Sequence, residues 1–197
     1  MAGDPALIVN GAAVVTTATL GAGICVAVDY RYVDRSDGTV LDCNTGRVWL
    51  KDASCLGSGV WSSEGAFSSA QWKVGELNTG GDLGCVDYTP GTYTDWELPA
   101  LAELCGLWDG SCTGTSCCTA TAGLVDTTFS NPALGNAAGE AQWAPEDAFV
   151  GVESPPAYWT ATEHDAGNAW LVNFLDGEVE PAPKAFLLQA WPVRSEQ

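Results

Sequence analysis

The sequence is poor in positive charge. Only seven of its 197 residues are Lys or Arg, against 25 Asp and Glu, which gives a formal net charge of -18 at neutral pH. Nucleic-acid binding needs clustered basic side chains that displace counterions from phosphates. We therefore expect no nucleic-acid partner, and anionic membranes and sulfated polymers are disfavoured for the same reason. The acidity is typical of a protein that stays soluble, including in salty or calcium-rich water.

Long apolar runs and histidine are scarce as well. No segment reaches the roughly 18 apolar residues that a membrane-spanning helix needs, so we expect no membrane insertion. The only histidine, His164, lies in a polar turn without a nucleophile motif, and Gly21-Ala22-Gly23 lacks the lysine of a phosphate loop. The sequence therefore predicts that this protein is not an enzyme. Hydrolysis by a carboxylate pair stays open, because any acidic chain offers such pairs.

Cysteine, by contrast, is well represented. An even number in a chain with 23 glycines is typical of a disulfide framework formed in an oxidising compartment. No Cys-x-x-Cys pair occurs, so a structural zinc site has no recognisable spacing. We expect all eight to be disulfide-bonded, with adjacent Cys117 and Cys118 taking separate partners; the connectivity stays open. The eight are Cys25, Cys43, Cys55, Cys85, Cys105, Cys112, Cys117 and Cys118.

Hydrophobic patterning predicts a mixed α+β domain. Apolar residues at helical spacing predict one helix over 64–77, and a second, shorter helix is expected over 99–108, with Pro99 in its first turn. The segment 109–157 is rich in Gly, Thr, Pro and Cys, which predicts a long loop held by disulfides. β-Branched and aromatic runs between turn residues predict strands near 30–34, 40–42, 47–50, 158–162, 169–174, 178–180 and 186–193.

Residues 1–29 differ from the rest of the chain. They contain two apolar runs, 6–20 and 24–28, with no basic residue before them, so we interpret them as part of the mature fold rather than as a signal peptide. We expect a β arm over 1–29, followed by a globular domain over 30–197. The arm either adds an edge hairpin to its own sheet or completes the sheet of a neighbouring subunit, and we favour the neighbour.

Several short motifs of the globular part follow one another in a specific order. Each is weak alone, but together, over roughly residues 30–194, they resemble the Lcl C-terminal domain family, named for a collagen-like adhesin. The motifs are Tyr32-Val33-Asp34, Asp37-Gly38-Thr39-Val40, Asp42-x-Asn44-Thr45-Gly46-x-x-Trp49, Tyr93-x-Asp95-Trp96-x-Leu98-Pro99 with Glu103-Leu104, Tyr158-Trp159-Thr160-Ala161-Thr162, Asn168-Ala169-Trp170-x-Val172-Asn173-Phe174, Asp176-Gly177-x-Val179 and Trp191-Pro192-Val193-Arg194.

The resemblance implies a fold related to the C-type lectins and the formylglycine-generating enzymes. We therefore expect a C-type-lectin-like domain with two short helices, a small antiparallel sheet and long disulfide-stapled loops, plus the N-terminal arm. It also implies an adhesive module outside the cell or on its surface. Three features depart from the family: Glu97 replaces the usual Arg, the cysteines are more numerous, and residues 1–29 lie outside the resemblance. The namesake is associated with sulfated glycans, which the net charge of -18 argues against here.

Candidate binding residues are few. The tryptophans at 49, 96, 159 and 170 are interpreted as core residues rather than as a sugar-binding platform. No cofactor is expected except calcium, which needs about six to eight converging oxygens. The best calcium candidates cluster around the turn of His164, although no known calcium-loop spacing is present: Glu163, Asp165, Asn168 and Asn173.

Two functions follow from these observations. The favoured one is a structural subunit that assembles with copies of itself into a filament or multimer through the N-terminal arm. The alternative is a monomeric adhesion module that binds a glycan or a surface protein, with or without the help of calcium.

Overall fold

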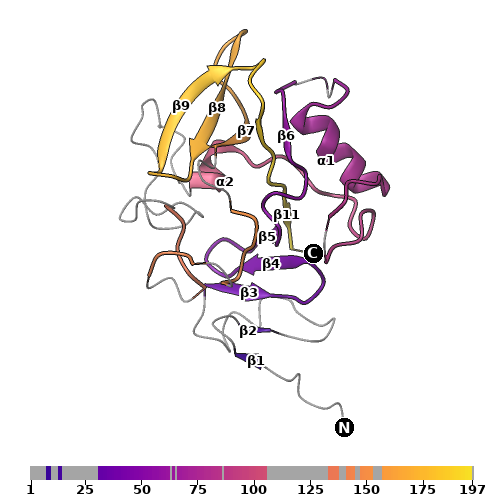
Figure 1. Cartoon of the computed structure of the whole chain (residues 1–197), viewed down its shortest axis with the longest axis vertical. Coiled ribbons are helices and arrows are strands. Elements are labelled where there is room, and N and C mark those ends of the chain that lie inside the picture. Colours follow the sequence, from indigo (N-terminus) through magenta and orange to yellow (C-terminus); the bar gives the residue numbers. More distant parts are fainter. Residues whose placement is uncertain are drawn as a thin grey trace.

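The computed structural model describes residues 8–9, 13–14, 31–62, 64, 66–85, 87–105, 133–137, 141–144, 147–152 and 157–196. Within them the chain forms two short helices and two mostly antiparallel sheets (Figure 1). The mixed α+β class and the number of helices are therefore confirmed, whereas the single small sheet of the prediction is wrong, because the strands divide between two sheets. Neither of these helices is long and apolar enough to cross a bilayer.

The first sheet, in the lower half of Figure 1, has six strands in the order β1-β2-β3-β4-β5-β11. A tight meander of β3, β4 and β5 forms its centre. Asp37 Oδ1 accepts from the backbone N–H of Thr39 (3.0 Å), and Gly38 adopts a left-handed φ of 81°, which gives the predicted Asp-Gly turn. The bounds are β1 (Ile8–Val9), β2 (Ala13–Val14), β3 (Tyr32–Asp34), β4 (Thr39–Asp42), β5 (Arg47–Leu50) and β11 (Val193–Ser195).

The second sheet, in the upper half of Figure 1, has five strands in the order β6-β10-β7-β8-β9. The strands β7, β8 and β9 form consecutive antiparallel hairpins, and β10 pairs in parallel with β7. The second turn, at Gly177, also has a left-handed φ, of 78°. The bounds are β6 (Ser58–Gly59), β7 (Ala157–Glu163), β8 (Asn168–Asn173), β9 (Glu178–Pro183) and β10 (Leu188–Gln189).

Helix α1 (Ala70–Thr79) begins six residues later than the sequence predicted. Ser68 has a φ of 63°, which a helix cannot contain, and the side chain of Ser69 caps the helix by accepting from the N–H of Trp72 (3.1 Å). The local chemistry of the cap therefore overrides the apolar spacing. Helix α2 (Leu101–Cys105) lies inside the range predicted for the second helix, whose last three residues fall outside the described residues.

Trp191 connects the two sheets in the core. Its ring is fully buried and lies 5.7 Å from that of Trp49 on β5 and 5.5 Å from that of Tyr158 on β7. Its Nε1 donates to the carbonyl of Leu50 at 2.7 Å, so the buried polar atom is satisfied. Phe149, from the segment predicted as a long loop, also packs on Trp191 at 4.9 Å. Parts of that segment therefore belong to the core.

Four residues of the N-terminal arm are described, and they form strands as predicted. β1 pairs with β2, and β2 pairs in parallel with β3, where Ala13 faces Val33 and Val14 faces Asp34. Within this single chain the arm thus extends its own sheet beyond β3. Pairing with a neighbouring subunit, which the sequence analysis favoured, stays a prediction, and the rest of residues 1–29 lie outside the described residues.

Candidate functional site

The C-terminal motif holds the middle of the chain in place. Arg194, with a side chain only 3% exposed, donates from Nε to Asp95 Oδ1 at 2.7 Å, and its guanidinium lies 4.0 Å from the ring centre of Tyr93. The hydroxyl of Tyr93 donates to Asp37 at 2.8 Å, and partial burial together with this bond raises the pKa of Tyr93. Motifs far apart in sequence therefore meet at one stacked cluster. Its groups satisfy one another, which is typical of a structural role.

Trp96 is fixed from several sides. Its indole N–H donates to the hydroxyl of Tyr88 at 2.7 Å, and the amide of Asn78 on α1 bonds both its backbone N–H and its carbonyl, at 2.8 and 2.9 Å. Trp49, Trp96 and Trp159 are each at most 3% exposed, so their interpretation as core residues is confirmed. Trp170, on β8, is half-buried and packs against the core.

Glu97, which departs from the family pattern, lies beside a cation from another element. Arg47 on β5 forms ion pairs with both Glu97 and Glu103. Glu103 also accepts from the backbone N–H of Ala100 (2.8 Å), which caps the start of α2. The exchange of Arg for Glu at position 97 is thus compatible with the local charge, because Arg47 supplies the opposite sign.

The four calcium candidates do not converge on one point. Asp165 accepts from the backbone N–H of Gly167 and from the side chain of Asn168, at 2.8 and 2.9 Å. The bonds from Asn168 above all hold the pKa of Asp165 well below its usual range. Glu163 forms an ion pair with Lys184 instead.

Asn173 lies at the opposite end of β8 from Asn168, about 17 Å away for a strand of this length. Its side-chain oxygen accepts from the N–H of Leu175. In the part of the chain that the structure describes, no three His, Cys, Asp or Glu side chains are grouped so that they could hold a metal ion. The structure thus brings only Asp165 and Asn168 into direct contact, and calcium binding stays a prediction.

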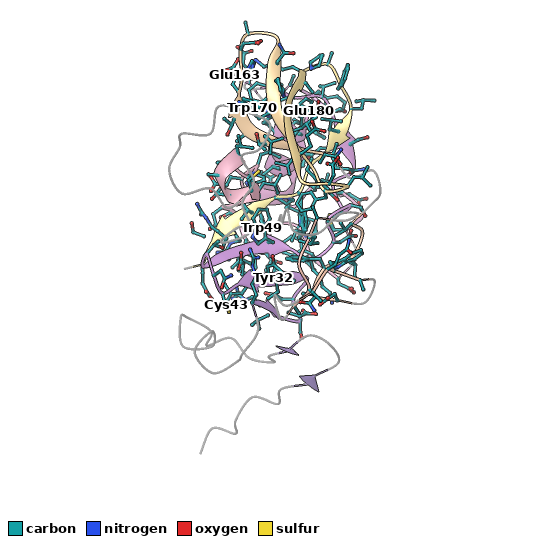
Figure 2. The ribbon with its side chains drawn as sticks, turned by 90° about the vertical axis from the view of Figure 1, so that its left-hand side faces the viewer. Tyr32, Cys43, Trp49, Glu163, Trp170 and Glu180 are labelled. Carbon is teal, nitrogen blue, oxygen red and sulfur yellow. A yellow bond between two sulfur atoms is a disulfide. The ribbon has the colours of Figure 1, made fainter. Side chains whose placement is uncertain are left out.

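His164 lies in the turn between β7 and β8. Its Nδ1 is 2.9 Å from Asp165 Oδ2, and its ring packs edge-on against Trp170 at 4.9 Å. Figure 2 shows Trp170 and Glu163 at the end of the molecule opposite to Tyr32 and Cys43. The Asp–His contact orients the ring, but neither of these neighbours supplies the hydroxyl or thiol nucleophile that acyl transfer would need.

Each described cysteine is oxidised. Cys55 is bonded to Cys85, with Cα atoms 4.8 Å apart, and this bond links the turn before β6 to the loop after α1. Cys43 and Cys105 are disulfide-bonded too, and no described cysteine is free. Full oxidation is thus confirmed for this half of the set. The other four, Cys25, Cys112, Cys117 and Cys118, lie outside the described residues.

Sequence reasoning missed the exposed apolar side chains near β6. Phe67 is 80% exposed, and its ring lies 4.7 Å from that of Trp72. Phe186 and Leu187, 53% and 68% exposed, come just before β10, which pairs with β6. The helix predicted over 64–77 contains Phe67, but α1 begins three residues after it. Phe186 and Leu187 fall at the start of the strand predicted over 186–193, and this assignment hid their exposure.

The fold and these contacts define a disulfide-bonded α+β domain whose motif residues hold the chain together. The family model of the Lcl C-terminal domain matches residues 38–194, so the chain belongs to the Lcl C-terminal domain family. The arm and β3 lie outside the match. No curated protein matches the chain significantly.

Proposed function

We propose that this chain is a non-enzymatic, adhesin-type module of the extracellular surface that joins copies of itself through its N-terminal arm. Disulfides support export, because they persist in oxidising compartments. Membership of the Lcl C-terminal domain family supports adhesion. The non-catalytic assignment is supported by the motif residues, because their polar groups bond to one another, as Arg194 bonds to Asp95.

We also propose that the fold is a distant relative of the C-type lectins. The support is the combination of two short helices with two small sheets, together with the relation that the family resemblance implies. This assignment bears on function because C-type-lectin-like domains use variable loops for binding, and the sequence predicts a long loop over 109–157 that carries three of the cysteines.

The observation that carries the assembly proposal is the state of the sheet edges. The outer strand β9 contains Pro181 and Pro183, which have no N–H to donate, and exposed Glu178 and Glu180. Prolines and charges at these positions prevent the addition of a further strand. This edge of the second sheet is therefore protected.

Two other edges are covered from within the chain. The backbone of Val193 on β11 exchanges two hydrogen bonds of 2.9 Å with Glu97. Beside β6, the carbonyl of Val60 accepts from the N–H of Ala70 at the start of α1. The remaining edge is that of the arm, where no described strand pairs with the outer side of β1 (Figure 1). Among the described residues this edge has no strand partner, and an unpaired edge on an apolar arm is suited to strand addition between copies.

A cysteine pair across β2 and β3 tests whether the arm is exchanged. Ala13 and Val33 are register partners, and neighbouring strands lie about 4.8 Å apart, which suits a disulfide. We expect the Ala13→Cys, Val33→Cys chain to form covalent multimers that run as a ladder on a non-reducing gel. The physical reason is that an exchanged arm places each Ala13 beside the Val33 of another copy.

The two single variants are the controls, because neither can form the new bond. If the double variant instead gives only a covalently closed monomer, and the unmodified chain is monomeric at the same concentration, the arm pairs within its own chain. The assembly proposal is then overturned.

That outcome would favour a monomeric adhesion module, which is the second candidate function. The specific support for it is the exposed apolar pair Phe186 and Leu187, together with Phe67. Exposed aromatic and aliphatic groups of this kind are common at binding surfaces for glycans and proteins.

A further inference from the structure

The few positively charged side chains lie at least partly inside the fold and contact groups of the same chain. Each of the seven Lys and Arg side chains is buried or half-buried. The ammonium of Lys73 donates to the carbonyls of Leu56 and Ser58, at 2.8 and 2.7 Å. Arg35 is half-buried, and its guanidinium lies near Tyr93. The other five form ion pairs with carboxylates: Arg31 with Asp42, Arg47 with Glu97 and Glu103, Lys51 with Asp34, Lys184 with Glu163, and Arg194 with Asp95.

The acidic residues are arranged differently, because many of them face solvent. The exposed acids without a Lys or Arg partner in the described structure lie around α1, in the two hairpin turns of the second sheet and on β9: Glu64, Asp82, Asp87, Asp165, Asp176, Glu178 and Glu180. A typical soluble surface mixes both signs of charge. Here every Lys and Arg is at least half-buried, and even Arg47, 29% exposed, is already paired with Glu97 and Glu103, so little positive charge is left to meet a carboxylate of a second copy.

Two copies of the chain therefore repel each other before they touch. The hydrogen bonds and apolar contacts of strand addition act only at contact, whereas the repulsion between two charges of -18 acts over the Debye length. That length falls from about 30 Å at 0.01 M salt to about 3 Å at 1 M. The balance between repulsion and contact is thus set by the ions of the medium.

We propose that assembly through the arm is gated by ionic strength, so that copies separate in dilute salt and associate in concentrated salt. This inference rests on the proposed assembly function. The gate works by screening rather than by coordination, because the exposed acids are spread over separate elements. The Arg31–Asp42 ion pair should be little weakened by salt, since it is shielded from solvent: the two side chains are 8% and 1% exposed.

Sedimentation velocity of the full chain, at one protein concentration across a NaCl series, tests the gate. We expect the association constant to rise at least about tenfold between 0.02 and 0.5 M NaCl, as the screening length shrinks. KCl should act alike, and CaCl₂ and MgCl₂ should match each other at equal ionic strength.

A charge variant sharpens the test. Glu178→Gln with Glu180→Gln removes two exposed negative charges from β9, where Pro181 and Pro183 still block strand addition, so the transition should move to lower salt. The matched control, Glu178→Asp with Glu180→Asp, keeps the charge and should leave the transition where it is.

Three results would overturn the inference in distinguishable ways. A monomer at every salt concentration removes the assembly and the gate with it. If multimers form equally well at all salt concentrations, the assembly proposal is supported and the dependence on ionic strength is refuted. Multimers that form only with calcium, at matched ionic strength, replace screening with a specific metal site.

Discussion

At the residue scale, the motifs of this chain contact one another across long distances in the sequence. Arg194 illustrates this best, because one side chain stacks on Tyr93 and bonds Asp95 while its backbone lies in β11. The motifs that define the resemblance are thus the places where distant segments are joined.

Replacement of Arg194 by Ala should lower the free energy of unfolding by about 2 kcal/mol. The change removes a partner from a largely buried ion pair and a cation–π contact. Arg47→Ala is the comparison, because Arg47 is 29% exposed and its surface ion pairs should contribute less than about 1 kcal/mol. Urea unfolding of both variants measures the difference in the free energy of unfolding. Equal losses of stability would mean that the cluster around Tyr93 contributes no more than a surface ion pair.

At the scale of elements, the close approach of β6 to α1 is decided by one glycine. A Cβ on Gly59 would lie 2.8 Å from the carbonyl oxygen of Ser68 and 3.0 Å from the N–H nitrogen of Ala70. Both are backbone atoms, so neither can rotate away. The helix and the strand are therefore in contact only because position 59 has no side chain.

Gly59→Ala should destabilise the protein by about 2 kcal/mol, because the overpacked backbone must shift. Gly75→Ala inside α1 is a matched control with the opposite sign. Nothing lies within 4 Å of a Cβ at Gly75, so alanine should stabilise the helix by about 0.5–1 kcal/mol. Thermal melting of the two variants compares them directly, and a neutral Gly59→Ala would show that β6 and α1 can separate without loss.

The sequence predicted the elements whose causes are local. The meander from Tyr32 to Leu50 follows from short runs of β-branched and aromatic residues and an Asp-Gly turn, and burial of Trp49, Trp96 and Trp159 follows from their size. Pairings over long distances could not be predicted, because no local pattern specifies that Gln189 lies beside Tyr158 or that Val193 lies beside Trp49. These pairings divide the strands between two sheets.

The candidate site was likewise predicted correctly only where the cause is local. Asp165 and Asn168 are near each other in the sequence, and their side chains are in direct contact, as expected. The expectation that Asn173 lies near them was wrong, because each residue of a strand advances the chain by about 3.4 Å. The exposure of Phe67 was missed because it depends on where α1 begins, and that was decided by the backbone of Ser68 and the cap of Ser69.

At the scale of the whole molecule, disulfides join regions that hydrogen bonds leave separate. The bond between Cys55 and Cys85 spans 30 residues, including all of α1. By restricting the unfolded chain, a loop of this length contributes about 3.5 kcal/mol of stability. Covalent links of this kind suit a protein that works outside the cell, where chaperones cannot refold it.

Cys55→Ser with Cys85→Ser should therefore lower the melting temperature by about 10 °C, at roughly 2–4 °C per kcal/mol for a chain of this size. Differential scanning calorimetry measures the shift. Mass spectrometry of the unreduced wild-type protein after thiol alkylation is the companion measurement, and we expect no label. Four or more labelled thiols in native protein would contradict the extracellular assignment.

The same bond also has a mechanical consequence. An adhesive or linking protein is stretched between the surfaces that it joins. When its two ends are pulled apart, only the residues outside a closed disulfide loop can extend. The segment between Cys55 and Cys85 is shielded from that force, which hides about 100 Å of contour at roughly 3.4 Å per residue. Under a stretch that ruptures both sheets, α1 would remain inside a closed covalent ring, from which the domain can rebuild when the load is released.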